Sequence, residues 1–109
     1  MTDKRIVLST AASEEEARKI AHHLVQHQLA ACVNIVPQIE SIYRWQGKVE
    51  SSQEWLLLIK TTAEKFEEVR AAIRELHSYD LPECVAIAIE DGSAEYLEWI
   101  GESVAGPDH

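Results

Sequence analysis

Cysteine and glycine are scarce in this chain of 109 residues, and each scarcity removes a class of function. The two cysteines, Cys32 and Cys84, are far apart and form no CxxC pair, which excludes a zinc finger and a disulfide scaffold. The four glycines form no GxGxxG or P-loop motif, and GxSxG and HExxH are absent too. The loop at 10–13 has neither Gly nor Arg and makes a poor phosphate cradle. We therefore do not expect an enzyme.

Long apolar runs are also missing near the beginning of the sequence. The first run, at residues 6–8, contains three strongly apolar residues. A secretory signal needs roughly 7–15 of them, and a membrane span needs roughly 20. We therefore expect a cytoplasmic protein that does not associate with a membrane.

Basic residues are outnumbered, with 10 Lys and Arg against 19 Asp and Glu and a net charge of −9. Proteins that bind nucleic acids or anionic lipids use basic patches to neutralise phosphates, so neither partner is expected. The imbalance lies in residues 61–109, which hold three basic and twelve acidic side chains. An acidic second half favours cations as ligands.

The apolar fraction of 46% is sufficient for a core, and the length fits one domain over residues 1–109. The first half alternates between strand and helix signals. An apolar run at 5–10 predicts a strand, and a capping box of Ser13 and Glu16 predicts a helix over about 14–28. Residues 31–61 have no helical period and predict two long strands joined by a turn at 46–48.

The second half repeats the pattern of helix and strand. Thr61, followed by Glu64, is a candidate cap for a helix that extends to Leu76. A loop at 77–83 precedes a last strand over 84–89 and a short terminal helix. The order βαββαβ predicts an α+β protein with an antiparallel sheet that carries its helices on one face.

The long hairpin predicts an oligomer. Its odd positions from Val33 to Trp45 are mostly apolar and are expected to share one face, while Pro37 calls for a sheet edge or a bulge. Each strand of about 14 residues reaches roughly 45 Å, against a radius of gyration of about 13 Å for a compact domain of this length. The tip is therefore expected to protrude and to expose Tyr43, Trp45 and Val49.

Two groups of side chains are candidates for ligand binding. His77 lies in a short loop with Tyr79, Asp80 and Glu83; these groups can bind Cu²⁺ or Zn²⁺ or a small polar ligand, or His77 can cap the preceding helix. Three histidines occupy the first helix. Of these, His23 and His27 are four residues apart and could grip a metal together, or belong to a solvated helix face.

Four segments in a fixed order carry a resemblance to a known family: residues 29–34 (LAACVN), 43–48 (YRWQGK), 57–61 (LLIKT) and 77–83 (HSYDLPE). Residues 96–100 (YLEWI) fit the family's last helix. Over about residues 5–104 the chain resembles the CutA divalent-cation-tolerance family. The resemblance implies a ferredoxin-like sandwich with an extra C-terminal helix and a long β-hairpin, assembled as a homotrimer. It also implies kinship with the trimeric PII signalling proteins and a role in binding copper or other divalent cations.

The family's attributed copper ligands carry over only in part. The resemblance places a Cys of the first strand at Ser9 and the first of two adjacent His residues at Leu76, so His77 alone remains. Losing two of three ligands weakens the case for a Cu²⁺ site.

Two functional hypotheses follow, and each has its own residues. The first is a trimeric protein that binds Cu²⁺ or another divalent cation through His77 and Glu83. The second is a PII-like module that binds a small ligand or a partner protein in a cleft between subunits. Its candidate cleft residues are Trp45, Glu54, Lys60 and Tyr79, together with His77 and Glu83.

Overall fold

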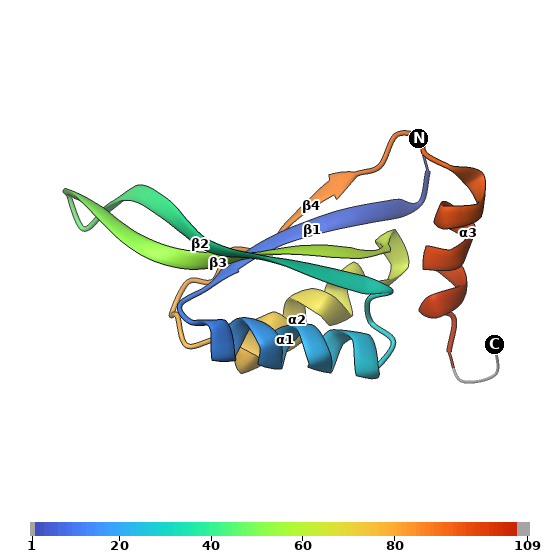
Figure 1. The fold of residues 1–109 in the computed structure, drawn as a ribbon, viewed down its shortest axis with the longest axis horizontal. Coiled ribbons are helices and arrows are strands. Elements are labelled where there is room, and N and C mark those ends of the chain that lie inside the picture. Colours follow the sequence, from blue (N-terminus) through green and yellow to red (C-terminus); the bar gives the residue numbers. More distant parts are fainter. Residues whose placement is uncertain (1, 107–109) are drawn as a thin grey trace.

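The computed structural model describes residues 2–106 and has the expected order of elements (Figure 1). The four strands are β1 (Lys4–Ala11), β2 (Cys32–Trp45), β3 (Lys48–Thr62) and β4 (Val85–Ala88). The helices are α1 (Glu14–Gln26), α2 (Phe66–Leu76) and α3 (Ala94–Ser103), with a 3₁₀ turn at Ala63–Lys65 ahead of α2. The last strand is thus shorter than the predicted 84–89.

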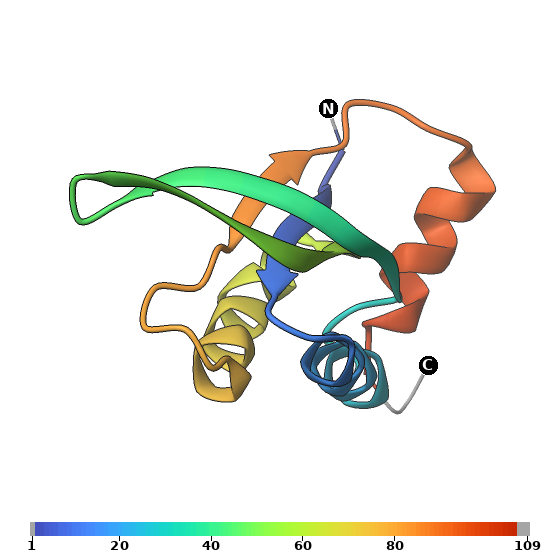
Figure 2. The same cartoon turned by 60° about the vertical axis from the view of Figure 1, so that its left-hand side comes forward.

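The strands form one antiparallel sheet in the order β2-β3-β1-β4, and α1 and α2 cover one of its faces (Figures 1 and 2). The core lies between the sheet and these helices. Its fully buried side chains include Val7, Leu57, Ile59, Ile20, Leu24, Val69 and Ile73. This is the predicted α+β, ferredoxin-like arrangement, with the extra helix α3 packed at the end of the sheet.

Helix α1 and the 3₁₀ turn that leads into α2 each begin where a side chain binds an exposed backbone N–H group. The Ser13 hydroxyl accepts a hydrogen bond from the Glu16 N–H, as the capping-box pattern predicted. The cap predicted for the second helix was wrong by one residue, and the observed cap belongs to the 3₁₀ turn, whereas α2 itself has no side-chain cap. Thr62 accepts a hydrogen bond from the Lys65 N–H, whereas Thr61 is fully buried and donates to the Leu29 carbonyl. Strand alternation turns Thr61 toward the core, so its hydroxyl is not placed to cap the helix.

A β-bulge changes which face β2 presents. Ile35 pairs with Leu57, and Ile39 pairs with Glu54. Between these two pairs β2 therefore contains one residue more than β3. Opposite residues of an antiparallel pair share a face, and Leu57 and Glu54 point to opposite faces of β3. The prediction of a single apolar face from Val33 to Trp45 was therefore wrong. Pro37 lies at the bulge, as predicted, and Gln38 has a left-handed φ of 54°.

The hairpin protrudes from the sheet, as its length predicted. The molecule measures 47 × 26 × 22 Å, and the β2–β3 tip extends along its longest dimension (Figure 1). The tip exposes Tyr43, Trp45 and Val49. No helix among residues 2–106 is long and apolar enough to cross a membrane.

Candidate functional site

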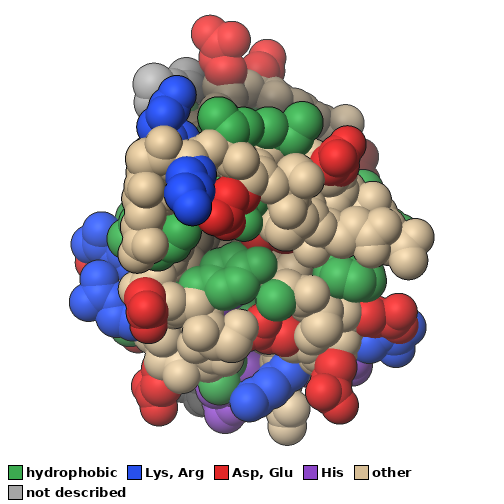
Figure 3. Space-filling view, turned by 90° about the vertical axis from the view of Figure 1, so that its left-hand side faces the viewer, with side chains coloured by type: hydrophobic (Ala, Val, Ile, Leu, Met, Phe, Trp, Pro, Cys, Tyr) green, Lys and Arg blue, Asp and Glu red, His purple; other side chains and the backbone are tan. Residues whose placement is uncertain are grey.

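An open cleft of about 920 Å³ lies between the hairpin and the loop that follows α2. The loop contributes residues 78–81 and Glu83, and β1 contributes Thr10. The strands of the hairpin contribute Tyr43 and Trp45 from β2 and alternate residues of β3. Figure 3 looks onto this end of the molecule, where hydrophobic side chains lie beside both acidic and basic ones. We call this feature the acidic cleft.

The acidic cleft has a strongly one-sided charge. Four carboxylates line it: Glu50, Glu54, Asp80 and Glu83. Among the described residues that line it there is no Lys, Arg or His. Because like charges gathered on one surface lower the local potential, the cleft attracts cations and repels anions.

Glu54 is the buried carboxylate of the cleft. It is 8% exposed, and its Oε2 accepts a 2.7 Å hydrogen bond from the Tyr79 hydroxyl. Partial burial raises the pKa of Tyr79 above its ordinary value, and the hydrogen bond to Glu54 raises it further. The phenol therefore stays a donor at neutral pH and holds the loop onto the middle of β3.

His77 lies beneath the cleft, and both of its ring nitrogens have partners. Its side chain is fully buried, Nε2 donates to the Thr10 carbonyl, and Nδ1 accepts a 3.1 Å hydrogen bond from the Tyr79 N–H. One donor and one acceptor are what a neutral imidazole provides. To ligate a metal, His77 would have to give up one of these two bonds.

Glu16 joins the start of α1 to the same loop. Its carboxylate accepts hydrogen bonds from the Ser78 N–H at 2.7 Å, the Ser78 hydroxyl at 3.0 Å and the Ala12 N–H at 3.3 Å. Burial alone would raise the pKa of Glu16, but these hydrogen bonds outweigh it and hold that pKa below its ordinary value. The sequence identified Glu16 as part of a helix cap and gave no sign of its link to the loop.

The family model described as "CutA1 divalent ion tolerance protein" matches residues 5–103. The chain belongs to this CutA1 family. The match confirms the resemblance carried by the four sequence segments.

Relatives of the CutA1 chain come from bacteria, archaea and plants. The "Divalent-cation tolerance protein CutA" of Thermus thermophilus is 52% identical over 100 residues, which cover 92% of this chain and 97% of that protein. The Archaeoglobus fulgidus protein of the same name is 50% identical over 95 residues, or 87% of this chain and 92% of that protein. The "Protein CutA, chloroplastic" of Arabidopsis thaliana is 47% identical over 98 residues, which cover 90% of this chain but 54% of that protein.

Solved structures agree with the fold of this CutA1 chain. The CutA structure from Xylella fastidiosa superposes with a TM-score of 0.92 at 42% identity, covering 94% of this chain and 99% of that one. The Thermus thermophilus structure gives a TM-score of 0.90 at 52% identity, covering 92% and 97%. The ferredoxin-like fold of the family is thus shared along nearly the whole chain.

The structure brings together most of the residues proposed for the CutA1 site. Trp45, Glu54, Tyr79 and Glu83 all line the acidic cleft. Lys60 is not among the lining residues, and its ammonium group contacts Asn34 of β2. Lys60 is six positions after Glu54 on β3, which amounts to roughly 20 Å of strand and explains its placement away from the cleft.

The positions aligned with the family's copper ligands do not form a metal centre here. Ser9 is fully buried and Leu76 is half-buried. Ser9 follows Val7 on the core-facing side of β1, whereas its neighbour Thr10 lines the acidic cleft. Within residues 2–106 no three His, Cys, Asp or Glu side chains are placed to hold a metal ion together.

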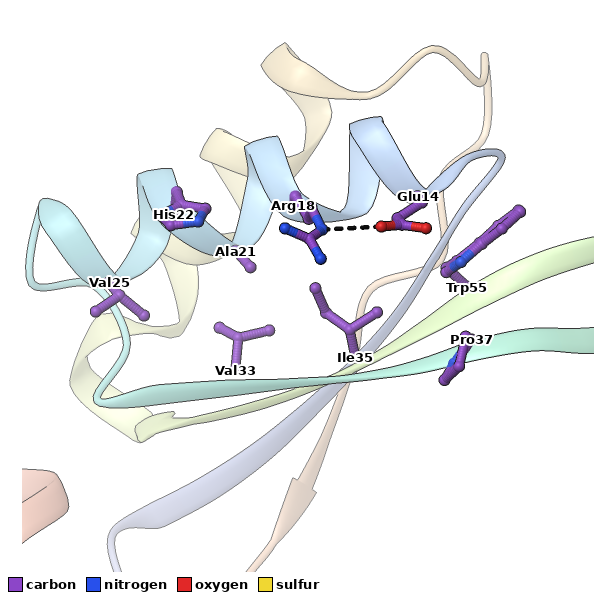
Figure 4. Close-up of a pocket in the computed structure, with 9 residues that line it drawn as sticks. All are labelled: Glu14, Arg18, Ala21, His22, Val25, Val33, Ile35, Pro37 and Trp55. Carbon is purple, nitrogen blue, oxygen red and sulfur yellow. Dashed lines mark ion pairs between the residues drawn. The ribbon is translucent and has the colours of Figure 1, made fainter.

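A second, smaller groove of about 550 Å³ lies between α1 and β2 (Figure 4). Its floor is apolar, with Val33 and Ile35 below α1 and Trp55 at one end. Glu14 and Arg18 form an exposed ion pair of 3.1 Å at its rim. Glu14 and Arg18 neutralise each other, so the described residues that line this groove do not give it the one-sided charge of the acidic cleft.

Proposed function

We propose that this CutA1 chain is a non-enzymatic protein that binds divalent cations in the acidic cleft and acts as a homotrimer. One observation carries the proposal: four carboxylates and no basic side chain line the cleft within the described residues. The family's description as divalent ion tolerance proteins supports the same class of ligand.

The donor atoms favour hard cations. Carboxylate, hydroxyl and water oxygens suit Mg²⁺, Ca²⁺ and Mn²⁺, whereas Cu²⁺ prefers imidazole or sulfur ligands. The carboxylates of the cleft do not converge on one point, so we propose that the combined charge of Glu83, Asp80 and Glu50 draws hydrated cations into the cleft, where water supplies most of the direct ligands. Copper binding at His77 and Glu83 needs a rearrangement that frees one nitrogen of His77. A separate titration with Cu²⁺, described below, tests this alternative.

Cation binding is tested by neutralising carboxylates in two places. The cleft variant replaces three exposed carboxylates by their amides: Glu50→Gln, Asp80→Asn and Glu83→Gln. The α3 variant is the matched control and removes the same charge from three exposed residues of that helix: Glu95, Glu98 and Glu102, each replaced by Gln. Calorimetric titration with Mn²⁺ is expected to give binding at least about tenfold weaker for the cleft variant, which is about 1.4 kcal/mol. The α3 variant should retain the affinity of the parent protein.

Equal loss of Mn²⁺ binding in both variants would mean that net charge alone attracts the ion, and would contradict a site in the cleft. A Cu²⁺ titration of His77→Ala completes the test. An isotherm unchanged by this substitution would remove His77 from the set of ligands.

The homotrimer is supported by the uncovered face of the sheet. Ile6, Leu8, Leu56 and Leu58 alternate with core residues and so point away from α1 and α2. Beside them on β4, Val85 and Ile87 are 51% and 48% exposed. A continuous apolar face of this kind marks an interface between proteins.

Sedimentation measures the oligomer directly. We expect a mass of about three times 12.3 kDa for the parent protein and dissociation for Ile87→Glu, which places a charge in the apolar face. The matched control is Val25→Glu, a 43% exposed position in the groove between α1 and β2, on the other side of the sheet from that face. A monomer at micromolar concentration would contradict the trimer, and identical behaviour of both variants would contradict its placement on this face.

A PII-like role is the second candidate, and the exposed aromatic side chains of the same cleft favour it. Tyr43 and Trp45 are about two-fifths exposed and offer flat surfaces for a small molecule. The carboxylates of the cleft would select a cationic or neutral ligand over an anionic one. A thermal-shift screen without metal separates the two candidates: stabilisation by an organic ligand supports the PII-like role, and a response restricted to metals opposes it.

A further inference from the structure

Two histidine rings lie in tilted contact near the C-terminal end of α1, away from the acidic cleft. His23 and His27 are one helical turn apart, and their ring centroids lie 4.3 Å from each other at an interplanar angle of 41°. His23 is half-buried and His27 is exposed. Within residues 2–106, neither ring makes a side-chain hydrogen bond or an ion pair, so both rings are free to rotate.

We propose that His23 and His27 chelate a divalent transition metal such as Ni²⁺, Zn²⁺ or Cu²⁺, at a site separate from the acidic cleft. Residues four apart on a helix face the same side, and imidazole nitrogens are preferred ligands of these ions. Two nitrogens that bind one ion at about 2.0–2.1 Å lie roughly 3 Å apart. Two rings whose centroids are 4.3 Å apart need only side-chain rotations to reach that geometry.

The end of the helix adds electrostatic support for a bound cation. The carbonyl groups of the last turn carry the negative end of the helix dipole, which stabilises positive charge placed there. His23 lies in this last turn and His27 is the C-cap residue. Lys19, one turn before His23, opposes the cation from the other side and limits the affinity.

The coordination shell would be completed by water. No third His, Cys, Asp or Glu joins the pair in the part of the chain that the structure describes. Two protein ligands with water give a weak and rapidly exchanging site, in contrast to a closed structural site with four protein ligands. Such a site suits reversible uptake of an ion rather than its permanent storage.

The pair is distinct from the acidic cleft in position and in chemistry. Glu16 contacts the cleft loop from the first turn of α1, whereas His23 and His27 lie seven and eleven residues further along, or roughly 10–16 Å at 1.5 Å per residue. Nitrogen donors select Ni²⁺ and Zn²⁺, while the carboxylates of the cleft suit Mn²⁺ and Ca²⁺. The proposal therefore goes beyond the function proposed above and can fail without affecting it.

The experiment is a titration with Ni²⁺, followed by calorimetry and by paramagnetic broadening of the histidine ring protons in NMR spectra. His23→Ala and His27→Ala should each weaken this binding by on the order of tenfold to a hundredfold, because one tethered ligand is lost. His22→Ala is the matched control. It removes an imidazole from the same helix, but Val25 and Gln26 stand three and four residues after it and offer no partner ligand.

Selective broadening of His23 and His27, with His22→Ala unchanged, supports the chelate. Equal losses in all three variants would show that the imidazoles bind singly, and unchanged affinity in His23→Ala and His27→Ala would place the ion elsewhere; either result overturns the proposal. Circular dichroism checks that the variants, which alter exposed or half-buried positions, keep the helix content of the parent. The cleft variant at Glu50, Asp80 and Glu83 should keep the Ni²⁺ broadening of His23 and His27, which separates this site from the proposed function.

Discussion

The hydroxyl of Tyr79 donates a 2.7 Å hydrogen bond to the buried carboxylate of Glu54, across 25 positions of sequence. Tyr79 belongs to the loop after α2, and Glu54 belongs to β3. Tyr79 also donates its backbone N–H to His77, and the two rings lie 4.6 Å apart in a tilted contact. Tyr79 thus joins the loop to β3 directly through its hydroxyl, and to β1 indirectly through His77, which donates to the Thr10 carbonyl.

Replacing Tyr79 by Phe should destabilise the fold through Glu54. The ring and its contact with His77 remain, but a carboxylate that is 8% exposed loses its hydroxyl donor. A buried acceptor without a partner costs about 1–3 kcal/mol, and we expect a loss of that size in urea unfolding. Tyr43→Phe is the control, since Tyr43 lines the same cleft without a side-chain hydrogen bond among the described residues. Equal effects of the two substitutions would contradict a role for the Tyr79–Glu54 bond.

Ser9 and Thr61 offer a paired test of buried hydroxyl groups. Both are fully buried, but the Thr61 hydroxyl donates to the Leu29 carbonyl at 2.6 Å, while Ser9 Oγ is the one buried side-chain polar atom among residues 2–106 without a hydrogen-bond partner. Ser9→Ala should therefore leave the free energy of unfolding unchanged or raise it by up to about 1 kcal/mol. Thr61→Val should lower it by about 1–2 kcal/mol. Thermal unfolding measures both, and a clear loss in Ser9→Ala would reveal a partner for its hydroxyl.

Gln28 occupies a backbone position that favours glycine. Its φ is 57°, and the Gln28 and Leu29 N–H groups donate to the Val25 and Leu24 carbonyls, the double hydrogen bond of a Schellman helix end. Gln28→Gly should raise the free energy of unfolding by about 1 kcal/mol, because a side chain is strained at this φ. Gln26→Gly, in the last helical position, should instead lower it by about 0.5–1 kcal/mol. Chemical denaturation that gave the same sign for both variants would contradict the strain at Gln28.

The fold was predictable because its signals are periodic and local. The apolar stripe of α1, the Ser13 cap and the alternation of the strands each depend on neighbours within a few residues. The end of α1 was placed too late, at about residue 28, because a glutamine stands where the sequence usually shows glycine. The change of face at the bulge was missed as well, since one extra residue in β2 is defined only against its partner strand.

The sequence predicted which residues line the candidate site better than it predicted the hydrogen bonds between them. Tyr79, Glu83, Glu54 and Trp45 were expected together, and the structure does place them along one cleft. Lys60 was grouped with them as well, but the distance along β3 separates it from Glu54. The bonds of His77 to the Thr10 carbonyl and the Tyr79 N–H are tertiary contacts, which no spacing within the sequence encodes.

The carboxylate of Glu16 should make the free energy of unfolding depend on pH in the acidic range. Burial opposes its charge, but the hydrogen bonds from Ser78 and Ala12 prevail and lower the pKa of Glu16 in the folded protein. A lowered folded-state pKa contributes stability above the unfolded value of about 4.3–4.5, and this contribution is lost as the pH falls through the folded value. Glu16→Gln should therefore be less stable than the parent at pH 7, and the difference should shrink below about pH 4.5. Urea unfolding from pH 7 to pH 3 measures it, with the neighbouring exposed Glu15→Gln as the control. A difference between the parent and Glu16→Gln that stayed constant over this range would mean that the link to Ser78 does not depend on the charge of Glu16.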